Sequence, residues 1–201
     1  MIDPVIQLLI SLGFSLLFVV SGIHKLSNRL RFQEIIDAYQ IVPLGWGPFV
    51  VVKIGIVELT HGAAWLIGNS VLIPLFSAVL LNIYIIAISI NLFRGRTYID
   101  CGCGFSGFTG AQESNDGIQQ LSFSLVGRNF SLVGLLLISV LPISNREIGV
   151  VDYLSIMLGL LSALFIYAAT NQLLSNHNSM KIILGKQPKV LPHLASDRGI
   201  I

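Results

Sequence analysis

Long apolar runs, separated by short polar stretches, cover most of the chain. Five runs stand out, at residues 5–23, 47–67, 71–93, 129–143 and 148–169. A transmembrane helix needs about 20 consecutive, mostly apolar residues. All of the runs except 129–143 are long enough to cross a bilayer alone, and losing that fourth span would reverse the orientation of everything after it. The pattern predicts about five membrane spans.

Helices rather than strands are expected in these runs. Within hydrocarbon every backbone N–H and C=O needs a partner, so only helices and closed barrels span a bilayer. Barrel strands alternate apolar and polar residues, whereas a stretch such as Leu135-Leu136-Leu137-Ile138 does not alternate. The predicted fold class is therefore all-α, a polytopic transmembrane helical bundle. Glycines at positions 13, 22, 55, 62, 134 and 159 suit close approach of its helices.

Composition supports a membrane location. Of the residues, 54% are hydrophobic and only 11% are charged, with a mean hydropathy of +0.81. Soluble domains carry about 25% charged residues, so this chain could not cover a water-facing surface. The net charge is +2, and no run of basic residues is interleaved with aromatic residues. The expected partner is therefore the lipid bilayer, not a nucleic acid.

Three polar stretches separate or follow the spans. Residues 24–46 link the first two spans, and their part 30–39 is predicted to form a short interfacial helix. Residues 94–128 contain both cysteines of the chain. The domain organisation expected is a bundle over residues 1–174, followed by a polar, loosely ordered tail over 175–201.

The distribution of Lys and Arg predicts the orientation. With five spans, ten of these residues fall on one face of the membrane and only Arg146 falls on the other. The ten are Lys25, Arg29, Arg31, Arg94, Arg96, Arg128, Lys181, Lys186, Lys189 and Arg198. Because cytoplasmic loops are enriched in Lys and Arg, we expect a multi-pass protein of the cell membrane with its N-terminus outside and its C-terminus in the cytoplasm. The cysteine loop would then face the cytoplasm.

Cys101 and Cys103 are the most reactive candidates in the chain. A disulfide needs Cα atoms about 4.4–6.8 Å apart, and two residues of extended chain span roughly 6.6–7.2 Å. The backbone must therefore bend to close the ring, and Gly102 permits the bend while Gly104 keeps the flank permissive. Strained or exposed disulfides are the easily reduced kind. The spacing favours a catalytic pair that cycles between dithiol and disulfide.

Charges around the pair have opposing effects. Arg94 and Arg96 would favour a thiolate, whereas Asp100 would disfavour it. Two other interpretations stay open. Free cysteines are commonly small buried hydrophobes without a function, and a structural zinc site needs four ligands. The chain offers one cysteine pair and histidines at 24, 61, 177 and 193, so no metal is expected.

A second group of polar residues lies inside the second predicted span: Lys53, Glu58 and His61. Ionisable groups in a membrane are costly, roughly 2.5–3.5 kcal/mol for Asp, Lys or Arg at the centre. Glu58 and His61 are three residues apart and share a helix face. They suit either a quinone-head or proton-relay site, or a packing cluster that meets Asn82 or Ser89 of the third span. Lys53 is expected to reach the interface by snorkelling.

Several segments resemble methylamine utilisation protein MauE and its relatives, a group placed beside DoxX-like small membrane proteins. The segments are Arg94-Gly-Arg96 followed by Ile99-Asp100-Cys101-Gly102-Cys103-Gly104-Phe105, then Ser21-Gly-Ile-His-Lys-Leu26, Glu58, and Arg128-Asn129. The resemblance covers about residues 5–170 and implies a four-helix DoxX-like core plus one helix. The family usually has Cys-Gly-Cys-Phe-Gly, whereas Gly104 precedes Phe105 here.

The resemblance implies a membrane factor that helps mature methylamine dehydrogenase, by forming disulfides in its cysteine-rich small subunit. Cys101 and Cys103 would be the redox pair, and a thioredoxin-like or cysteine-rich protein the partner. A quinone as electron acceptor follows only by analogy with membrane thiol oxidases. Disulfides form outside the cytoplasm, so either the thiols are reached through the bundle, or the chemistry is cytoplasmic, or the span count is off by one. The alternative function is a non-enzymatic assembly factor or small transporter with incidental cysteines.

Overall fold

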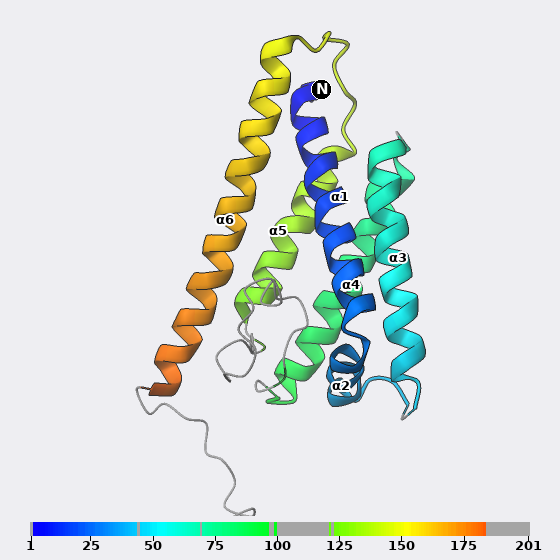
Figure 1. Ribbon diagram of the computed structural model, residues 1–201, viewed down its shortest axis with the longest axis vertical. Helices are drawn as coiled ribbons and strands as arrows, with labels where there is room; N and C mark the ends of the chain where they lie inside the picture. The colour runs from blue at the N-terminus through cyan, green and yellow to red at the C-terminus, as the bar shows by residue number, and fades with distance from the viewer. Residues whose placement is uncertain are drawn as a thin grey trace, which may run out of the picture.

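Each of the five apolar runs is helical over most of its length in the computed structural model (Figure 1), which describes residues 2–43, 45–68, 70–96, 99, 121 and 123–183. These residues form six helices and no strand. The helices are α1 (Pro4–Ser27), α2 (Arg29–Tyr39), α3 (Gly47–Ile67), α4 (Leu72–Phe93), α5 (Phe123–Ser139) and α6 (Val150–Ile183). The predicted all-α bundle is confirmed, and α2 is the short helix expected at 30–39.

The number of spans depends on α5. Among the described residues, α1, α3, α4 and the Val150–Thr170 part of α6 are long and apolar enough to cross a membrane, whereas the apolar part of α5 is shorter. Extended chain beyond α5 continues toward the end of the bundle where α1 begins (Figure 1). There, Ile2 N–H donates to Pro142 O at 2.9 Å and Ser144 N–H donates to Ile2 O at 2.8 Å. The chain therefore reverses direction after α5, and about five spans result.

The bundle has two chemically different ends. The N-terminal end holds the starts of α1, α4 and α6, and the opposite end, which we call the α2 end, holds α2 and the starts of α3 and α5 (Figure 1). Arg29, Arg31, Arg94 and Arg96 lie at the α2 end. At the N-terminal end Arg146 forms ion pairs with Asp3, at 2.8 Å, and with Asp152. The structure thus separates the basic residues as the sequence predicts.

Helices α1 and α3 approach each other closely because small residues line their contact. A Cβ atom built on Gly22 would lie 2.9 Å from Gly55 O, and one built on Gly62 would lie 3.1 Å from Ser15 O. Ser15 Oγ donates to Gly62 O at 2.9 Å. The expectation of glycine-mediated packing is confirmed here. It fails at Gly13 and Gly134, where a Cβ would meet nothing within 4 Å.

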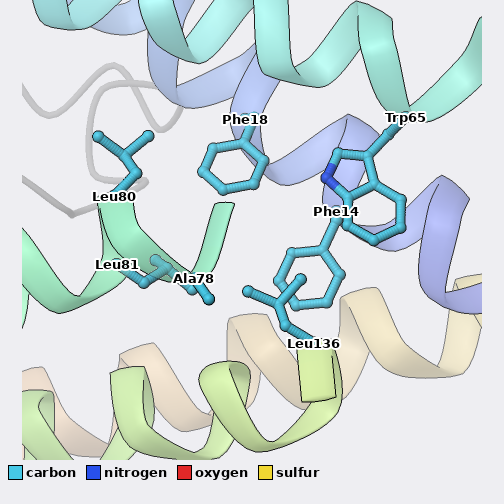
Figure 2. Close-up of a cluster of buried hydrophobic side chains, with 7 residues drawn as sticks. All are labelled: Phe14, Phe18, Trp65, Ala78, Leu80, Leu81 and Leu136. Carbon is cyan, nitrogen blue, oxygen red and sulfur yellow. The ribbon is translucent and has the colours of Figure 1, made fainter. Parts of the chain in front are cut away.

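An aromatic and aliphatic core joins α1, α3, α4 and α5 (Figure 2). Its buried members are Phe14, Phe18, Trp65, Ala78, Leu80, Leu81 and Leu136. Trp65 stacks on Phe14, with ring centroids 5.5 Å apart, and its Nε1 donates to Ser77 Oγ at 3.0 Å. Leu136 is fully buried, so α5 is an integral part of the bundle despite its length.

Helix α6 runs past the end of the predicted apolar segment. The apolar run was expected to end at residue 169 and the polar tail to begin at 175, but α6 continues to Ile183. Residues 170–183 contain neither proline nor glycine, so no residue of this stretch interrupts the helix. Only 6% of its membrane-length window is buried. Gly159 meets Leu9 of α1, and Arg128 of α5 stands over the Tyr167 ring at 5.6 Å.

Candidate functional site

The predicted redox pair lies in a part of the chain outside the described residues. This applies to Asp100, Cys101, Gly102, Cys103 and Gly104. The structure does describe the residues through which the chain enters and leaves this segment. These residues fix where the cysteine segment is attached to the bundle.

The two flanks of the cysteine segment meet at the α2 end of the bundle. Leu121 N–H donates to Ile99 O at 3.2 Å. Both side chains are buried and pack with Ile88 of α4 and Leu125 of α5. The two points where the chain enters and leaves the cysteine segment are therefore held together beside the end of α4 and the start of α5.

The two predicted supporting arginines lie on the entering flank. Arg94 follows α4 directly, and its Nη1 donates to Gln40 O, just beyond α2, at 3.5 Å. Gly95 has a φ of +72°, and Arg96 N–H donates to Asn91 O at 3.0 Å. The chain thus turns away from the helix axis immediately after α4. Arg94 is exposed, which agrees with an interfacial position for this turn.

Glu58 forms the one buried salt bridge among the described residues. Its side chain is 1% exposed and that of Lys25 is 12% exposed. Lys25 Nζ lies 2.8 Å from both Glu58 Oε1 and Glu58 Oε2. Glu58 is in the middle of α3, and Lys25 comes from the last turn of α1. An ion pair joins the two helices in the part of the bundle where water is scarce.

Two hydroxyl groups complete the hydrogen bonding of this pair. Ser21 Oγ donates to Glu58 Oε1 at 3.1 Å, and Tyr84 OH of α4 donates to the same oxygen at 2.6 Å. Lys25 Nζ donates to Ser21 Oγ at 2.6 Å. We refer to Ser21, Lys25, Glu58 and Tyr84 as the Glu58 cluster. It satisfies the carboxylate with an ammonium and two hydroxyls, which is what a buried charge requires.

Aromatic rings enclose the ammonium of Lys25. Its Nζ lies 5.7 Å from the centroid of Phe32 on α2 and 5.5 Å from that of Tyr84. A cation near the face of an aromatic ring is attracted by the ring quadrupole. Phe32 is itself buried. The Glu58 cluster and its aromatic shell therefore connect α1, α2, α3 and α4.

His61 does not join this cluster through any contact that the structure gives. Its Nδ1 lies 2.8 Å from Val57 O, one turn earlier in the same helix. Its ring lies between Phe18 and Phe76, with centroids 6.1 Å and 6.4 Å away. The spacing of Glu58 and His61 suggested a shared helix face, but their side chains have different surroundings. Glu58 lies among polar groups, and His61 lies beside aromatic rings.

The partners expected on α4 also differ. Asn82 Nδ2 donates to Ala78 O within its own helix, and Tyr84 supplies the contact to Glu58 instead. Lys53 is exposed, and its snorkelling to the interface stays a prediction. Sequence analysis did not select Lys25 as a site residue because it closes an apolar run and was counted as a flanking charge. A signal was available, since a carboxylate in the middle of a span needs a cation from another helix.

Helix α4 presents further polar residues at intervals of seven: Ser77, Tyr84 and Asn91. Ser77 and Asn91 are fully buried. Asn91 Nδ2 donates to Ala87 O, while its Oδ1 has no hydrogen-bond partner among the described residues. A spacing of seven keeps residues on one helix face. The polar row therefore runs along the face that α4 turns to the bundle interior.

Comparison with known proteins gives a consistent result. The chain matches the family model described as Methylamine utilisation protein MauE over residues 3–142. It is 30% identical to Methylamine utilization protein MauE of Paracoccus denitrificans over 139 residues, which are 68% of this chain and 69% of that protein. It is 33% identical to Methylamine utilization protein MauE of Methylophilus methylotrophus over 104 residues, 50% of this chain and 54% of that protein. No solved structure matches the chain.

Proposed function

The chain belongs to the MauE family of methylamine utilisation proteins, and we propose that it acts there as a membrane thiol–disulfide exchange and maturation factor. Cys101 and Cys103 are the exchanging pair. The substrate is a cysteine-rich protein that needs its disulfides formed, such as the small subunit of methylamine dehydrogenase. The multi-pass helical bundle is the membrane anchor that carries the pair.

One observation carries this proposal. Both cysteines of the chain fall in a single Cys-Gly-Cys element, and the flanks of their segment, Ile99 and Leu121, are fixed together at the α2 end of the bundle. A pair attached to the end of a membrane bundle suits exchange with a protein in water better than a role in packing. The small ring of such a disulfide favours easy reduction.

The proposed exchange consists of two successive attacks by thiolates of the partner. The Cys101–Cys103 disulfide is attacked by a thiolate of the partner, which forms a mixed disulfide and releases one thiolate of the pair. A second partner thiolate then attacks the mixed disulfide. The partner leaves with a new disulfide, and Cys101 and Cys103 become a dithiol. A thioredoxin-like disulfide or a membrane quinone is the class of oxidant that would restore the pair.

The orientation that we propose places the α2 end in the cytoplasm and the N-terminus outside. Arg29, Arg31, Arg94 and Arg96 lie at the α2 end, and positive residues favour the cytoplasmic side. Because thiols on that side are kept reduced, a membrane quinone rather than a thioredoxin-like protein is the oxidant that would hold Cys101 and Cys103 as a disulfide there.

Cysteine replacement tests the proposal. We expect Cys101→Ser and Cys103→Ser to abolish disulfide formation in the partner subunit while the protein still inserts into the membrane at the wild-type level. The measurement is the redox state of the partner's cysteines, read by alkylation and gel shift in cells that express both proteins. Gly13→Ala is the matched control, because a Cβ at Gly13 meets no other atom within 4 Å. Complete partner oxidation in both cysteine variants would contradict the proposal.

The Glu58 cluster favours a second candidate function, a non-enzymatic assembly factor or small transporter with incidental cysteines. Its basis is the buried ion pair of Lys25 and Glu58, since charged residues inside a membrane often mark a functional path. This candidate predicts that Glu58→Gln or His61→Ala impairs methylamine utilisation more than loss of the cysteines does. We prefer a packing role for the cluster, because three helices supply its members and each oxygen of Glu58 already accepts a hydrogen bond.

A further inference from the structure

Lys53 is a cation that the described part of the bundle does not neutralise. It lies inside the membrane-spanning helix α3 and its side chain is exposed. The ion pairs among the described residues have Lys25 and Arg146 as their cations, and none of them includes Lys53. A charged residue within a membrane normally has a partner of opposite charge. The missing ion pair therefore favours an anion that belongs to another molecule.

Lys53 lies on the side of α3 that faces away from the bundle. The buried residues of α3 include Val51 and Gly55, and Lys53 is two positions from each of them. Two residues turn a helix by about 200°, so the side chain of Lys53 is on the side opposite to the buried one. Figure 1 shows α3 at the edge of the bundle. In a bilayer this outer side of α3 meets lipid.

The depth of Lys53 allows its ammonium to reach the membrane interface. Lys53 is the seventh residue of α3 counted from Gly47, which places its Cα about 9 Å along the helix axis from the first residue. Side chains on a helix tilt toward its N-terminus, and α3 begins at the α2 end of the bundle. The side chain can therefore extend toward the lipid headgroups at the α2 end, while its methylene groups stay in hydrocarbon.

Two exposed aromatic residues lie between Lys53 and the α2 end, on the same side of α3. Phe49 is 67% exposed and Trp46 is 59% exposed. They precede Lys53 by four and seven residues, and both spacings keep residues on one helix face. Trp46 directly precedes α3 but already has helical backbone angles, with φ −87° and ψ −11°. Because tryptophan is enriched at the boundary between membrane and water, Trp46 marks the level at which a headgroup would meet Lys53.

We propose that Lys53, Phe49 and Trp46 form a binding site for the headgroup of an anionic phospholipid. The ammonium of Lys53 pairs with the phosphate, and the two aromatic rings flank the headgroup. The acyl chains lie along the exposed apolar residues that follow on α3, which include Ile56 and Val57. The site needs neither cysteine, so it stands independently of the thiol–disulfide exchange proposed above.

Trp46 serves as the reporter for a test on the full-length protein. The chain has two tryptophans, so in a Trp65→Phe background all tryptophan emission comes from Trp46. The protein is reconstituted in phosphatidylcholine vesicles, and part of the lipid is replaced by phosphatidylglycerol or phosphatidylcholine with brominated acyl chains. Bromine quenches tryptophan emission on contact. The quenching at each mole fraction therefore gives the relative affinity of the two lipids for the surface around Trp46.

The expected result is an affinity about fivefold higher for brominated phosphatidylglycerol than for brominated phosphatidylcholine. Lys53→Met should remove this preference, and Lys53→Arg should retain it. Arg29→Gln is the matched control, because it removes the same charge from the α2 end but from a different helix, at an exposed position. The preference at Trp46 should persist in this variant.

Native mass spectrometry repeats the comparison without the Trp65→Phe substitution. After incubation with phosphatidylglycerol, Lys53→Met should retain fewer bound lipid molecules than the wild-type chain. In a Trp46→Phe background, the emission of Trp65 provides the baseline, because Trp65 is only 5% exposed and should not distinguish the two lipids.

Equal quenching of Trp46 by the two brominated lipids would overturn the proposal. An unchanged preference in Lys53→Met would overturn it as well. So would an equal loss of preference in Lys53→Met and Arg29→Gln, because the general positive potential of the α2 end, and not Lys53, would then attract the lipid.

Discussion

The ion pair of the Glu58 cluster should show strong energetic coupling. Glu58 is 1% exposed and Lys25 is 12% exposed, so the protein and not water must compensate each charge. Removing one partner of a buried pair costs about 3–5 kcal/mol, because the other charge is left uncompensated. Replacing both partners with neutral residues is often close to neutral. The variant with both residues replaced, which carries neither charge, should therefore be more stable than the less stable of the two single variants.

The geometry predicts an order for the single variants. Lys25→Met leaves the Glu58 carboxylate with two hydroxyl donors, Ser21 and Tyr84, and should cost an amount near the top of that range. Glu58→Gln leaves an ammonium near the end of α1, which can turn toward the polar α2 end and regain water. Its cost should fall near the bottom of the range. Lys25→Met combined with Glu58→Gln should lose about 1–2 kcal/mol, the value of the remaining hydrogen bonds.

Unfolding of the purified protein in mixed micelles by increasing SDS, followed by tryptophan fluorescence, measures these differences. The double-mutant cycle gives the coupling free energy directly. Lys53→Met is the matched control, since Lys53 is an exposed lysine in the same bundle and should change stability by less than about 0.5 kcal/mol. If the losses of the two single variants simply add in the double variant, the buried ion pair does not stabilise the bundle and the packing role assigned to it is wrong.

Two further predictions concern helix packing. Gly62→Ala should separate α1 from α3, because the new Cβ would lie 3.0 Å from Val19 N and 3.1 Å from Ser15 O. The SDS concentration at the unfolding midpoint should therefore fall, whereas that of Gly13→Ala, whose Cβ meets nothing within 4 Å, should stay the same or rise. Equal midpoints for the two variants would refute the close contact. Ser77→Ala should leave the buried Trp65 N–H without an acceptor and cost about 1–3 kcal/mol, seen as a lower midpoint and altered near-ultraviolet dichroism, whereas an unchanged spectrum would show that Ser77 is not its partner.

The positions of the helices followed from hydropathy alone because a membrane leaves few alternatives for an apolar run. The end of α6 was harder to predict. Its continuation to Ile183 runs through a stretch rich in Asn, Ser and His, whose low intrinsic helix propensity does not indicate a helix. The crossing at α5 also needed the structure, because the extended chain that pairs with Ile2 has no sequence signal of its own.

Some of the polar site residues could likewise be predicted from the sequence, whereas others needed the structure. A carboxylate at position 58 is visible in the sequence as a costly residue in a span, so the site was found. Its partners were not, because they come from two other helices, α1 and α4, and pairing across helices depends on rotation and depth, which one sequence does not reveal. Lys25 looked like a flanking charge, and Tyr84 looked like part of an apolar run. Both acquire their role only when α1 and α4 are packed against α3.

Thiol labelling of intact cells tests the central claim, a redox-active cysteine pair at the α2 end, most directly. A membrane-impermeant maleimide that adds measurable mass is applied to cells with and without prior reductant, and to inverted membrane vesicles in parallel. The account predicts that Cys101 and Cys103 react only in vesicles, and that reductant increases their labelling because part of the population is disulfide-bonded. Labelling of both cysteines that is identical before and after reduction, from either side, would contradict it.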